Sequence, residues 1–265
     1  MSHLAAGDIS LIDRCLDFYL THDGLVDLAE RHPENKLLHG RGQPGTHDVP
    51  LLVDTLHRIS RINQPGTTRR SDIDSSSISA SDDGSIVNLP VFDKSLFAGQ
   101  GDRAPLSIEI RGPLDVFILE GWSLGFRPLS EEAIRGYLPD PVPPPPCPAP
   151  YKMQEHPLTA LLQINENLVK VATDVYPFFP LHVVIRPRSY GYVYDWRLQQ
   201  ERQMKAINGG AGMSDDEVAR FVDRYMPAYE VWGNEGLTRR EERGDENGRE
   251  VLELVYDEGR RVIQA

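Results

Sequence analysis

The sequence has 265 residues, of which 40% are hydrophobic and 26% are charged, and its formal net charge is -12 at pH 7. This acidic balance disfavours nucleic acids and anionic membranes as partners, because both attract basic proteins, and it leaves small molecules as the favoured ligands. The two cysteines, Cys15 and Cys147, lack a metal-ligand spacing, and no apolar run approaches the ~20 residues that span a bilayer. We expect one cytoplasmic domain over residues 1–265.

The first half of the chain predicts one helix, one flexible insertion and one strand. Apolar residues recur at helical spacing over residues 49–62, directly after Asp48, which is a suitable N-cap. Residues 66–85 are mostly Ser, Asp, Thr and Arg, so we expect a flexible insertion there. The apolar run at 115–119 predicts a strand of a buried parallel sheet, and residues 181–185 form a second such run.

Eight prolines fall between residues 139 and 150, so residues 139–157 are predicted to form a proline-rich linker with polyproline geometry. Such a run could bind a protein partner of the SH3 type, but a plain spacer is the more common outcome. Helices are predicted next at 158–175 and 192–207. A third helix, at 215–229, should begin with a capping box formed by Ser214 and Glu217.

The C-terminal residues 251–265 read as a short hairpin around an Asp-Glu-Gly turn. Helices that alternate with isolated apolar strands predict a parallel α/β sheet. In such a sheet, active-site residues lie beyond the carboxyl ends of the strands. Glu120 follows the first apolar strand, where its carboxylate could hold Mg²⁺ or the water shell of Mg²⁺. The alternative is an ordinary acid facing solvent at a strand end.

Three further sets of polar residues are candidates for ligand binding. Lys94 and Arg103 stand on a loop broken by glycines, where they could converge on a phosphate or carboxylate, or simply be exposed charges of a turn. Residues 41–48 form a turn-rich stretch that leads into a helix N-terminus, a place that favours anions. Arg197 could reach phosphates from a lid, or pair with Glu201 one helical turn away.

Seven short motifs, taken together, resemble the fungal and plant-type D-glycerate 3-kinase family. They occur in the family's order between residues 17 and about 237, and their joint occurrence is specific although each is weak alone. The motifs are DFYLTH (17–22), RGQPGTHD (41–48), LPVFDKS (89–95), GDR (101–103), ILEGW (118–122), WRLQQE (196–201) and FVDRYMP (221–227).

This resemblance implies a P-loop kinase fold similar to that of uridine kinase and phosphoribulokinase. It implies transfer of the ATP γ-phosphate, with Mg²⁺, to a hydroxyl of a small acid such as D-glycerate. Carried over by position, Glu120 would lie near the metal, and Arg197 would belong to the lid. The substrate-binding residues would be Lys94, Arg103, Arg41, His47 and Asp48.

The sequence departs from the family pattern at two places. Family members carry a G-x-x-x-x-G-K-[ST] phosphate loop before the Asp-Phe-Tyr segment, but here none of the five lysines follows a glycine. The family also reads Asp-Asp-Phe-Tyr, where the first Asp is by analogy the base that takes the acceptor proton. That position is Leu16, and Asp17 remains one residue away as the catalytic candidate. We therefore expect a fold that lacks its first strand and phosphate loop, with very low activity.

Two explanations of these departures stay open. In the first, the chain is an N-terminally incomplete version of an ordinary kinase, which predicts further coding sequence upstream. In the second, it is a shortened pseudokinase that binds glycerate-like acids or a protein, which predicts an ordered strand within residues 1–16 and acid binding without ATP. A third reading is a scaffold that presents the proline run to partners, and pull-downs that survive deletion of residues 139–150 would contradict it.

Overall fold

A computed structural model of the protein describes residues 11–15, 18–64, 86–138, 146–207, 209–210, 212–233 and 250–264. The chain divides into two compact units. The first unit comprises Met1–Leu25 and His47–Leu124, and the second comprises Val26–Thr46 and Gly125–Ala265. The expected flexible insertion at 66–85 lies outside the described residues, as do residues 139–145 of the proline run.

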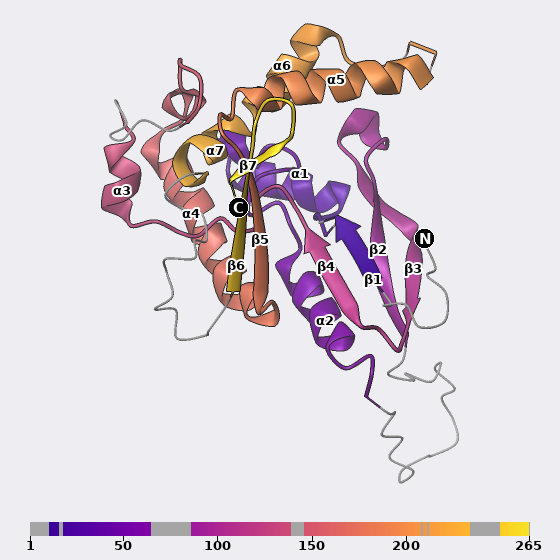
Figure 1. Ribbon diagram of the computed structural model, residues 1–265. Helices are drawn as coiled ribbons and strands as arrows, with labels where there is room; N and C mark the ends of the chain where they lie inside the picture. Colours follow the sequence, from indigo (N-terminus) through magenta and orange to yellow (C-terminus); the bar gives the residue numbers. More distant parts are fainter. Residues whose placement is uncertain are drawn as a thin grey trace. The chain divides into compact units, whose positions relative to one another are not determined.

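The elements alternate between strands and helices along the chain (Figure 1). Within the described residues there are also four short 3₁₀ helices, at Lys36–Leu38, Phe97–Gly99, Lys152–Glu155 and Tyr176–Phe178. In chain order the strands and α-helices are β1 (Leu11–Cys15), α1 (His22–Arg31), α2 (Val49–Ile59), β2 (Ile86–Asp93), β3 (Asp102–Arg111), β4 (Val116–Glu120), α3 (Glu131–Gly136), α4 (Leu158–Asp174), β5 (Leu181–Pro187), α5 (Tyr192–Ile207), α6 (Asp215–Asp223), α7 (Met226–Trp232), β6 (Glu250–Tyr256) and β7 (Val262–Gln264).

The first unit contains a parallel strand pair and an antiparallel hairpin (Figure 1). Strands β1 and β4 run parallel, in a register that places Cys15 beside Glu120. Strands β2 and β3 form the hairpin, and α2 packs against β2. Because alternate residues of a strand point to opposite faces, Val87 and Leu89 are buried together, with Ile110 on the partner strand.

The helices follow the apolar periodicity of the sequence. Helix α2 begins at Val49 because the Asp48 side chain accepts a hydrogen bond from the backbone N–H of Leu51, at 3.0 Å. It ends at Ile59, three residues earlier than expected. The predictions for α4 and α5 are confirmed. The capping box of Ser214 and Glu217 is also present at the start of α6.

One predicted helix is wrong as a continuous element. The expected helix at 215–229 is two helices, α6 and α7, separated at residues 224–225. Pro227 stands in the first turn of α7. Proline has no N–H to donate and its ring clashes with the preceding turn, so it is tolerated at the start of a helix but not inside one.

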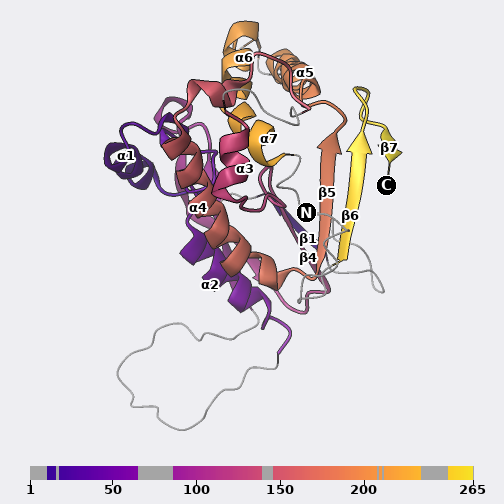
Figure 2. The same ribbon diagram turned by 90° about the vertical axis from the view of Figure 1, so that its left-hand side faces the viewer.

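The second unit holds a three-stranded sheet in the order β5-β6-β7, in which β5 and β6 are parallel and β6 and β7 form the predicted C-terminal hairpin. Helices α3, α4 and α7 lie on one side of this sheet (Figure 2). Side chains of α4, among them Leu161, Ile164 and Leu168, supply the apolar core together with Trp232 of α7.

The expectation that both parallel strands are buried holds for only part of each strand. In β5, Val184 is 5% exposed, but Leu181, Val183 and Ile185 are 52–59% exposed on the opposite face. In β4, Val116 is 38% exposed. The apolar pattern therefore identifies the strands correctly, whereas their burial depends on which elements cover them. Within the described ranges, no helix is long and apolar enough to cross a membrane.

Candidate functional site

Arg103 joins two segments that are distant in the sequence within the first unit. Its Nε and Nη2 atoms donate to the carbonyl oxygen of Tyr19, at 3.2 and 3.0 Å, and Nη2 pairs with Oδ2 of Asp48 at 2.5 Å. The Asp48 backbone N–H donates to the carbonyl of Phe18 at 2.7 Å. We call Tyr19, His47, Asp48 and Arg103 the Arg103 cluster. Three of the predicted substrate-binding residues thus lie together.

His47 is the buried member of the Arg103 cluster. Its ring stacks on the Tyr19 ring, with 4.5 Å between centroids, and Tyr19 meets the edge of Phe92. Burial lowers the pKa of His47 from 6.5 to about 4, because the protonated ring would lose its hydration. The ring is therefore neutral near pH 7. Its Nε2 atom has no hydrogen-bond partner among the described residues.

Asp102, next to Arg103, fixes the loop that enters β3. Its Oδ1 atom accepts hydrogen bonds from the backbone N–H groups of His22, at 2.9 Å, and Arg103, at 2.7 Å. The His22 ring in turn stacks on Phe97, with 3.7 Å between centroids. Phe97 has a φ of 49°, which is costly for a residue with a side chain. The stack packs the first residue of α1 against the 3₁₀ helix that begins at Phe97.

Three other predicted residues, Lys94, Glu120 and Asp17, belong to the first unit. Lys94 is exposed, in a turn where Asp93 accepts hydrogen bonds from the N–H and hydroxyl of Ser95, and these bonds lower the pKa of Asp93. Glu120 is exposed at the carboxyl end of β4, as expected for a strand-end acid. Asp17 lies outside the described residues.

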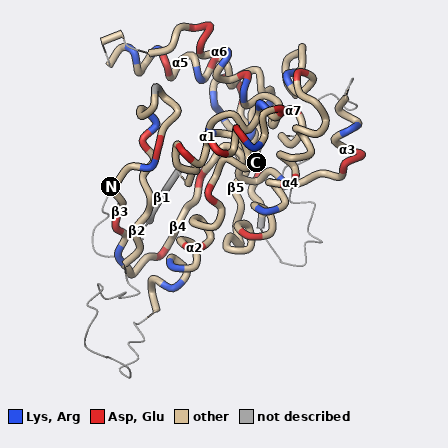
Figure 3. Tube along the Cα trace, turned by 180° about the vertical axis from the view of Figure 1, so that it is seen from behind, with Lys and Arg blue, Asp and Glu red and all other residues tan. Residues whose placement is uncertain are grey.

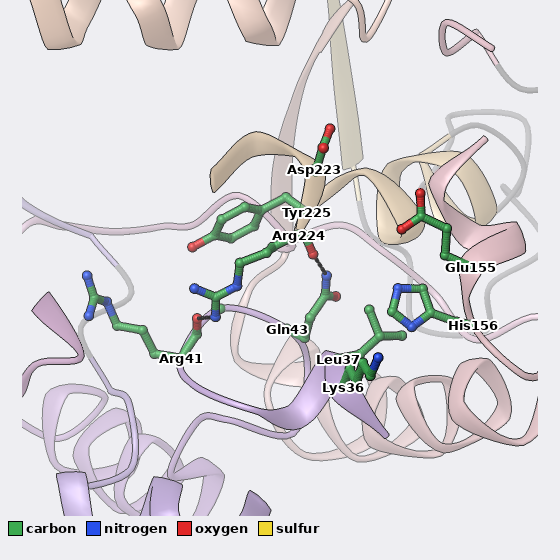
Figure 4. Close-up of a pocket in the computed structure, with 10 residues that line it drawn as sticks. Lys36, Leu37, Arg41, Gln43, Glu155, His156, Asp223, Arg224 and Tyr225 are labelled. Atoms are coloured by element: carbon green, nitrogen blue, oxygen red, sulfur yellow. Dashed lines mark hydrogen bonds between the residues drawn. The ribbon is translucent and has the colours of Figure 1, made fainter. Parts of the chain in front are cut away.

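A pocket of about 170 Å³ lies in the second unit (Figure 4). It is formed by the loop that contains the predicted Arg41, by the 3₁₀ helix at Lys152–Glu155, and by the segment between α6 and α7. We call it the Gln43 pocket. Its lining residues are Lys36, Leu37, Arg41, Gly42, Gln43, Glu155, His156, Asp223, Arg224 and Tyr225.

The loop of the Gln43 pocket requires glycine at two positions. Gly45 has a φ of +107°, and a Cβ atom there would lie 2.1 Å from Nδ2 of Asn167, which instead donates to the carbonyl of Pro44. Gly42 has a φ of +141° and lies against the Tyr225 ring. The Thr46 hydroxyl closes the loop by donating to the carbonyl of Gln43, at 2.8 Å.

The charges around the Gln43 pocket are unevenly compensated. Lys152, which is not one of the lining residues, pairs with Asp223 at 3.1 Å and with Glu155 at 3.2 Å. The Tyr194 hydroxyl also donates to Asp223, at 2.6 Å. Arg224, by contrast, makes only long contacts to two backbone carbonyls among the residues that the structure describes, at 3.4 and 3.5 Å. Sequence reasoning placed Asp223 and Arg224 in a family motif but gave them no role.

Arg197 is engaged inside the second unit. It pairs with Oε2 of Glu201 at 2.8 Å, and its guanidinium stands 5.1 Å over the Phe221 ring. Glu201 is only 1% exposed, and its other oxygen accepts from the backbone N–H of Met213. The pair therefore joins α5 to the segment that leads into α6. Basic and acidic positions stand side by side along both helices (Figure 3).

Known proteins match the chain in sequence and in structure, although no protein-family model matches it. It is 35% identical over 218 residues to the chloroplastic D-glycerate 3-kinase of Arabidopsis thaliana, and 36% identical over 224 residues to the probable ATP-dependent kinase TDA10 of Saccharomyces cerevisiae. These alignments cover 82% and 83% of the chain, but only 39% and 64% of the two relatives. The chain thus spans less than two thirds of either curated relative.

A solved structure extends the match over nearly the whole chain. The D-glycerate 3-kinase of Cryptococcus neoformans superposes with a TM-score of 0.77 at 34% sequence identity. The superposition covers 97% of this chain and 79% of the fungal protein. The mixed α/β architecture, the order of the motifs and this similarity agree with one another. The chain belongs to the D-glycerate 3-kinase family and has the α/β fold of a P-loop kinase.

Proposed function

We propose that this chain supplies the acceptor-binding part of an ATP-dependent kinase that transfers a phosphoryl group to a hydroxyl of a small acid such as D-glycerate. Family membership supports this proposal, because relatives that match most of the chain carry the name D-glycerate 3-kinase. We further propose that the 265 residues alone turn over Mg-ATP very slowly, because they contain no Gly-Lys pair from which a phosphate loop is built.

The acceptor role rests on the hydrogen bonds and the partial exposure of the Arg103 guanidinium. Its Nε and Nη2 atoms are used by Tyr19 and Asp48, which fixes the plane of the guanidinium. The Nη1 atom has no partner within the described part of the chain, and the side chain is 24% exposed. A fixed guanidinium with unused donors is suited to bind a carboxylate or phosphate, because little side-chain entropy is lost on binding. Lys94 would add positive charge from the neighbouring loop.

Glu120 is the proposed partner of the metal. Mg²⁺ prefers oxygen ligands and is commonly held by one or two carboxylates together with phosphate oxygens and water. An exposed carboxylate at the carboxyl end of a parallel strand fits that requirement. No group of three or more potential ligands occurs among the described residues, so the metal would arrive with ATP. When bound, it would neutralise charge on the transferred phosphate.

Weak phosphoryl transfer is the expected consequence of the missing loop. Catalysis of this reaction depends on positioning and charge stabilisation of the β- and γ-phosphates, which a phosphate loop provides through backbone N–H groups and a lysine. Glycines 209, 210 and 212 precede α6, but no lysine follows them directly. Arg197, the proposed lid residue, is held through Nη2 by the buried Glu201, and 21% of its side chain is exposed.

Calorimetric titration of the purified chain with D-glycerate and, separately, with Mg-ATP tests the proposal, together with a coupled assay of ADP release. We expect D-glycerate to bind, Arg103→Gln to weaken that binding at least tenfold, and Arg111→Gln, at the exposed end of the same strand, to leave it unchanged. Turnover at ordinary enzyme rates would show that another segment holds the phosphates. Loss of D-glycerate binding from both variants would contradict the acceptor role of Arg103.

A second candidate function is a pseudokinase that binds small acids without ATP. Strand β1 (Leu11–Cys15) supports it, because this explanation predicts an ordered strand within residues 1–16. The two functions separate in one comparison, because a pseudokinase binds D-glycerate equally well with and without Mg-ATP and releases no ADP. A kinase part completed by further polypeptide would gain turnover when a phosphate-loop segment of a relative is fused upstream. A protein partner that binds residues 139–157 remains a proposal, which pull-downs with and without that segment test.

A further inference from the structure

The Gln43 pocket contains an unsatisfied buried acceptor. Gln43 is 4% exposed, and its Nε2 atom donates to the carbonyl of Arg224 at 2.7 Å (Figure 4). Its Oε1 atom has no hydrogen-bond partner among the described residues. A buried amide oxygen without a hydrogen-bond partner costs roughly 1–3 kcal/mol, because it has lost its hydration and gained no hydrogen bond in exchange. The side chain cannot turn without breaking the bond to Arg224, so this oxygen is held ready for a donor.

The same pocket contains two basic side chains that no acidic side chain among the described residues neutralises. The two lining acids, Asp223 and Glu155, share the ammonium of Lys152. Lys36 pairs with no acidic group within the described ranges, and Arg224 contacts only backbone carbonyls there. Burial lowers the pKa of His156, and this ring is neutral near pH 7. The local field therefore favours an anion, in a chain whose overall charge is -12.

We propose that the Gln43 pocket binds a small oxyanion that carries a hydroxyl group. Arg224 and Lys36 attract the charge, and Gln43 Oε1 accepts a hydrogen bond from the hydroxyl. A volume of about 170 Å³ lies below the ~300–1,000 Å³ of drug-sized sites, which restricts the ligand to a few heavy atoms. Both a short hydroxycarboxylate and a phosphate carry this chemistry. The inference concerns binding alone, and it needs neither ATP nor turnover.

The loop geometry supports a preformed site. The positive φ values of Gly42 and Gly45 and the Thr46 hydroxyl bond fix the backbone on both sides of Gln43. The Gly42 N–H is used by Thr46, at 2.9 Å, so the loop offers its side chain rather than its amides to a ligand. A rigid loop reduces the entropy lost when the ligand binds. Gln43 is thus a specificity residue, whereas Lys36 and Arg224 supply affinity.

Phosphate and sulfate provide the decisive pair of probes, because they share shape and charge type while only phosphate carries a hydroxyl near neutral pH. Calorimetric titration of the full chain is done at constant ionic strength, since exposed charges are screened by salt. We expect phosphate to bind about tenfold more tightly than sulfate, the difference that one hydrogen bond gives. In a second arm, measured on the Arg103→Gln variant so that binding at the Arg103 cluster does not contribute, D-glycerate should bind about tenfold more tightly than propionate, which has no hydroxyl.

Variants assign the binding to the pocket. Lys36→Ala and Arg224→Gln should weaken phosphate and sulfate by a similar factor of about three to ten. Gln43→Leu should remove the preference for phosphate while leaving sulfate binding unchanged. Lys170→Ala, an exposed lysine of α4 outside the pocket, is the matched control and should change nothing. Because Gln43 is buried, circular dichroism verifies that its variant folds, and the two exposed cations test the site independently of it.

Each outcome decides the proposal. A hydroxyl preference in the phosphate arm alone identifies phosphate as the source of the ligand. A preference in the D-glycerate arm alone identifies a hydroxycarboxylate. Three results would overturn the proposal. The first is that phosphate binds no more tightly than sulfate and D-glycerate no more tightly than propionate, and the second is that no probe binds at millimolar concentration. The third is that Lys36→Ala and Arg224→Gln leave the affinity unchanged. The kinase proposal fails separately, on ADP release and on the Arg103 variant, so the two failures are distinguishable.

Discussion

His47 should make the folded protein less stable in mild acid. Its pKa is about 4 in the folded state and 6.5 in an unfolded chain, because the ring is buried against Tyr19. Between these values the unfolded state binds a proton that the folded state does not bind. The free energy of unfolding therefore falls as the pH drops below 6.5, and this loss is complete below about pH 4. At ~1.4 kcal/mol for each pKa unit, the gap corresponds to about 3 kcal/mol.

Urea unfolding between pH 7.5 and pH 4 measures this contribution. We expect His47→Gln to lose about 3 kcal/mol less than the unsubstituted chain over that range, because the carboxylates titrate alike in both proteins. His57→Gln, an exposed histidine of α2, is the control and should follow the unsubstituted chain. The charges next to His47, on Asp48 and Arg103, pair with each other and largely cancel. If His47→Gln and the unsubstituted chain lose equal stability, burial of a neutral ring is not the cause.

Three substitutions test the loops and caps that place the candidate sites. Arg103→Gln should lower the free energy of unfolding by about 2 kcal/mol, because it leaves Asp48 partly buried and unpaired, whereas Arg111→Gln on an exposed pair should cost under ~0.5 kcal/mol in the same urea titration. Gly45→Ala should cost about 2 kcal/mol and weaken phosphate binding, since its Cβ atom would overlap Asn167; unchanged stability would contradict that loop geometry. Ser214→Ala should cost about 1 kcal/mol in thermal unfolding by removing the capping box, and an unchanged melting temperature would count against the cap.

Helix boundaries set by local chemistry could be predicted from the sequence. Asp48 and Ser214 cap α2 and α6 through bonds that span only three residues, so the signal lies within a short window. The break between α6 and α7 was also present in the sequence, as Pro227, but the apolar periodicity continued across it. The β2–β3 hairpin was not predicted. Both strands contain proline, which ordinarily argues against a paired strand.

The candidate sites were only partly predictable, for a different reason. The residue types of Arg103, Asp48 and His47 suggested anion binding, but their partners come from segments up to 84 positions apart. Gln43 lies in the turn-rich stretch at 41–48, but nothing in the sequence distinguished it there, because a glutamine in a turn is ordinary until its oxygen is buried without a partner. Arg197 had two readings, a lid residue and a surface pair with Glu201. The structure shows the pair, but Glu201 is 1% exposed, and the sequence did not indicate that burial.

Strand burial shows why a correct pattern can still mislead about its surroundings. The run at 181–185 was read as a strand covered on both faces, since such runs are typical of parallel sheets. Strand β5 does pair in parallel with β6, yet among the described residues it is the outer strand of this sheet, and three of its apolar side chains are more than half exposed. Apolar side chains of this size gain ~1.5–3 kcal/mol each when they are fully buried. The apolar side chains of β5 are therefore suited to a covered face. Among the residues that the structure describes, only part of the free energy available from burying these side chains is gained.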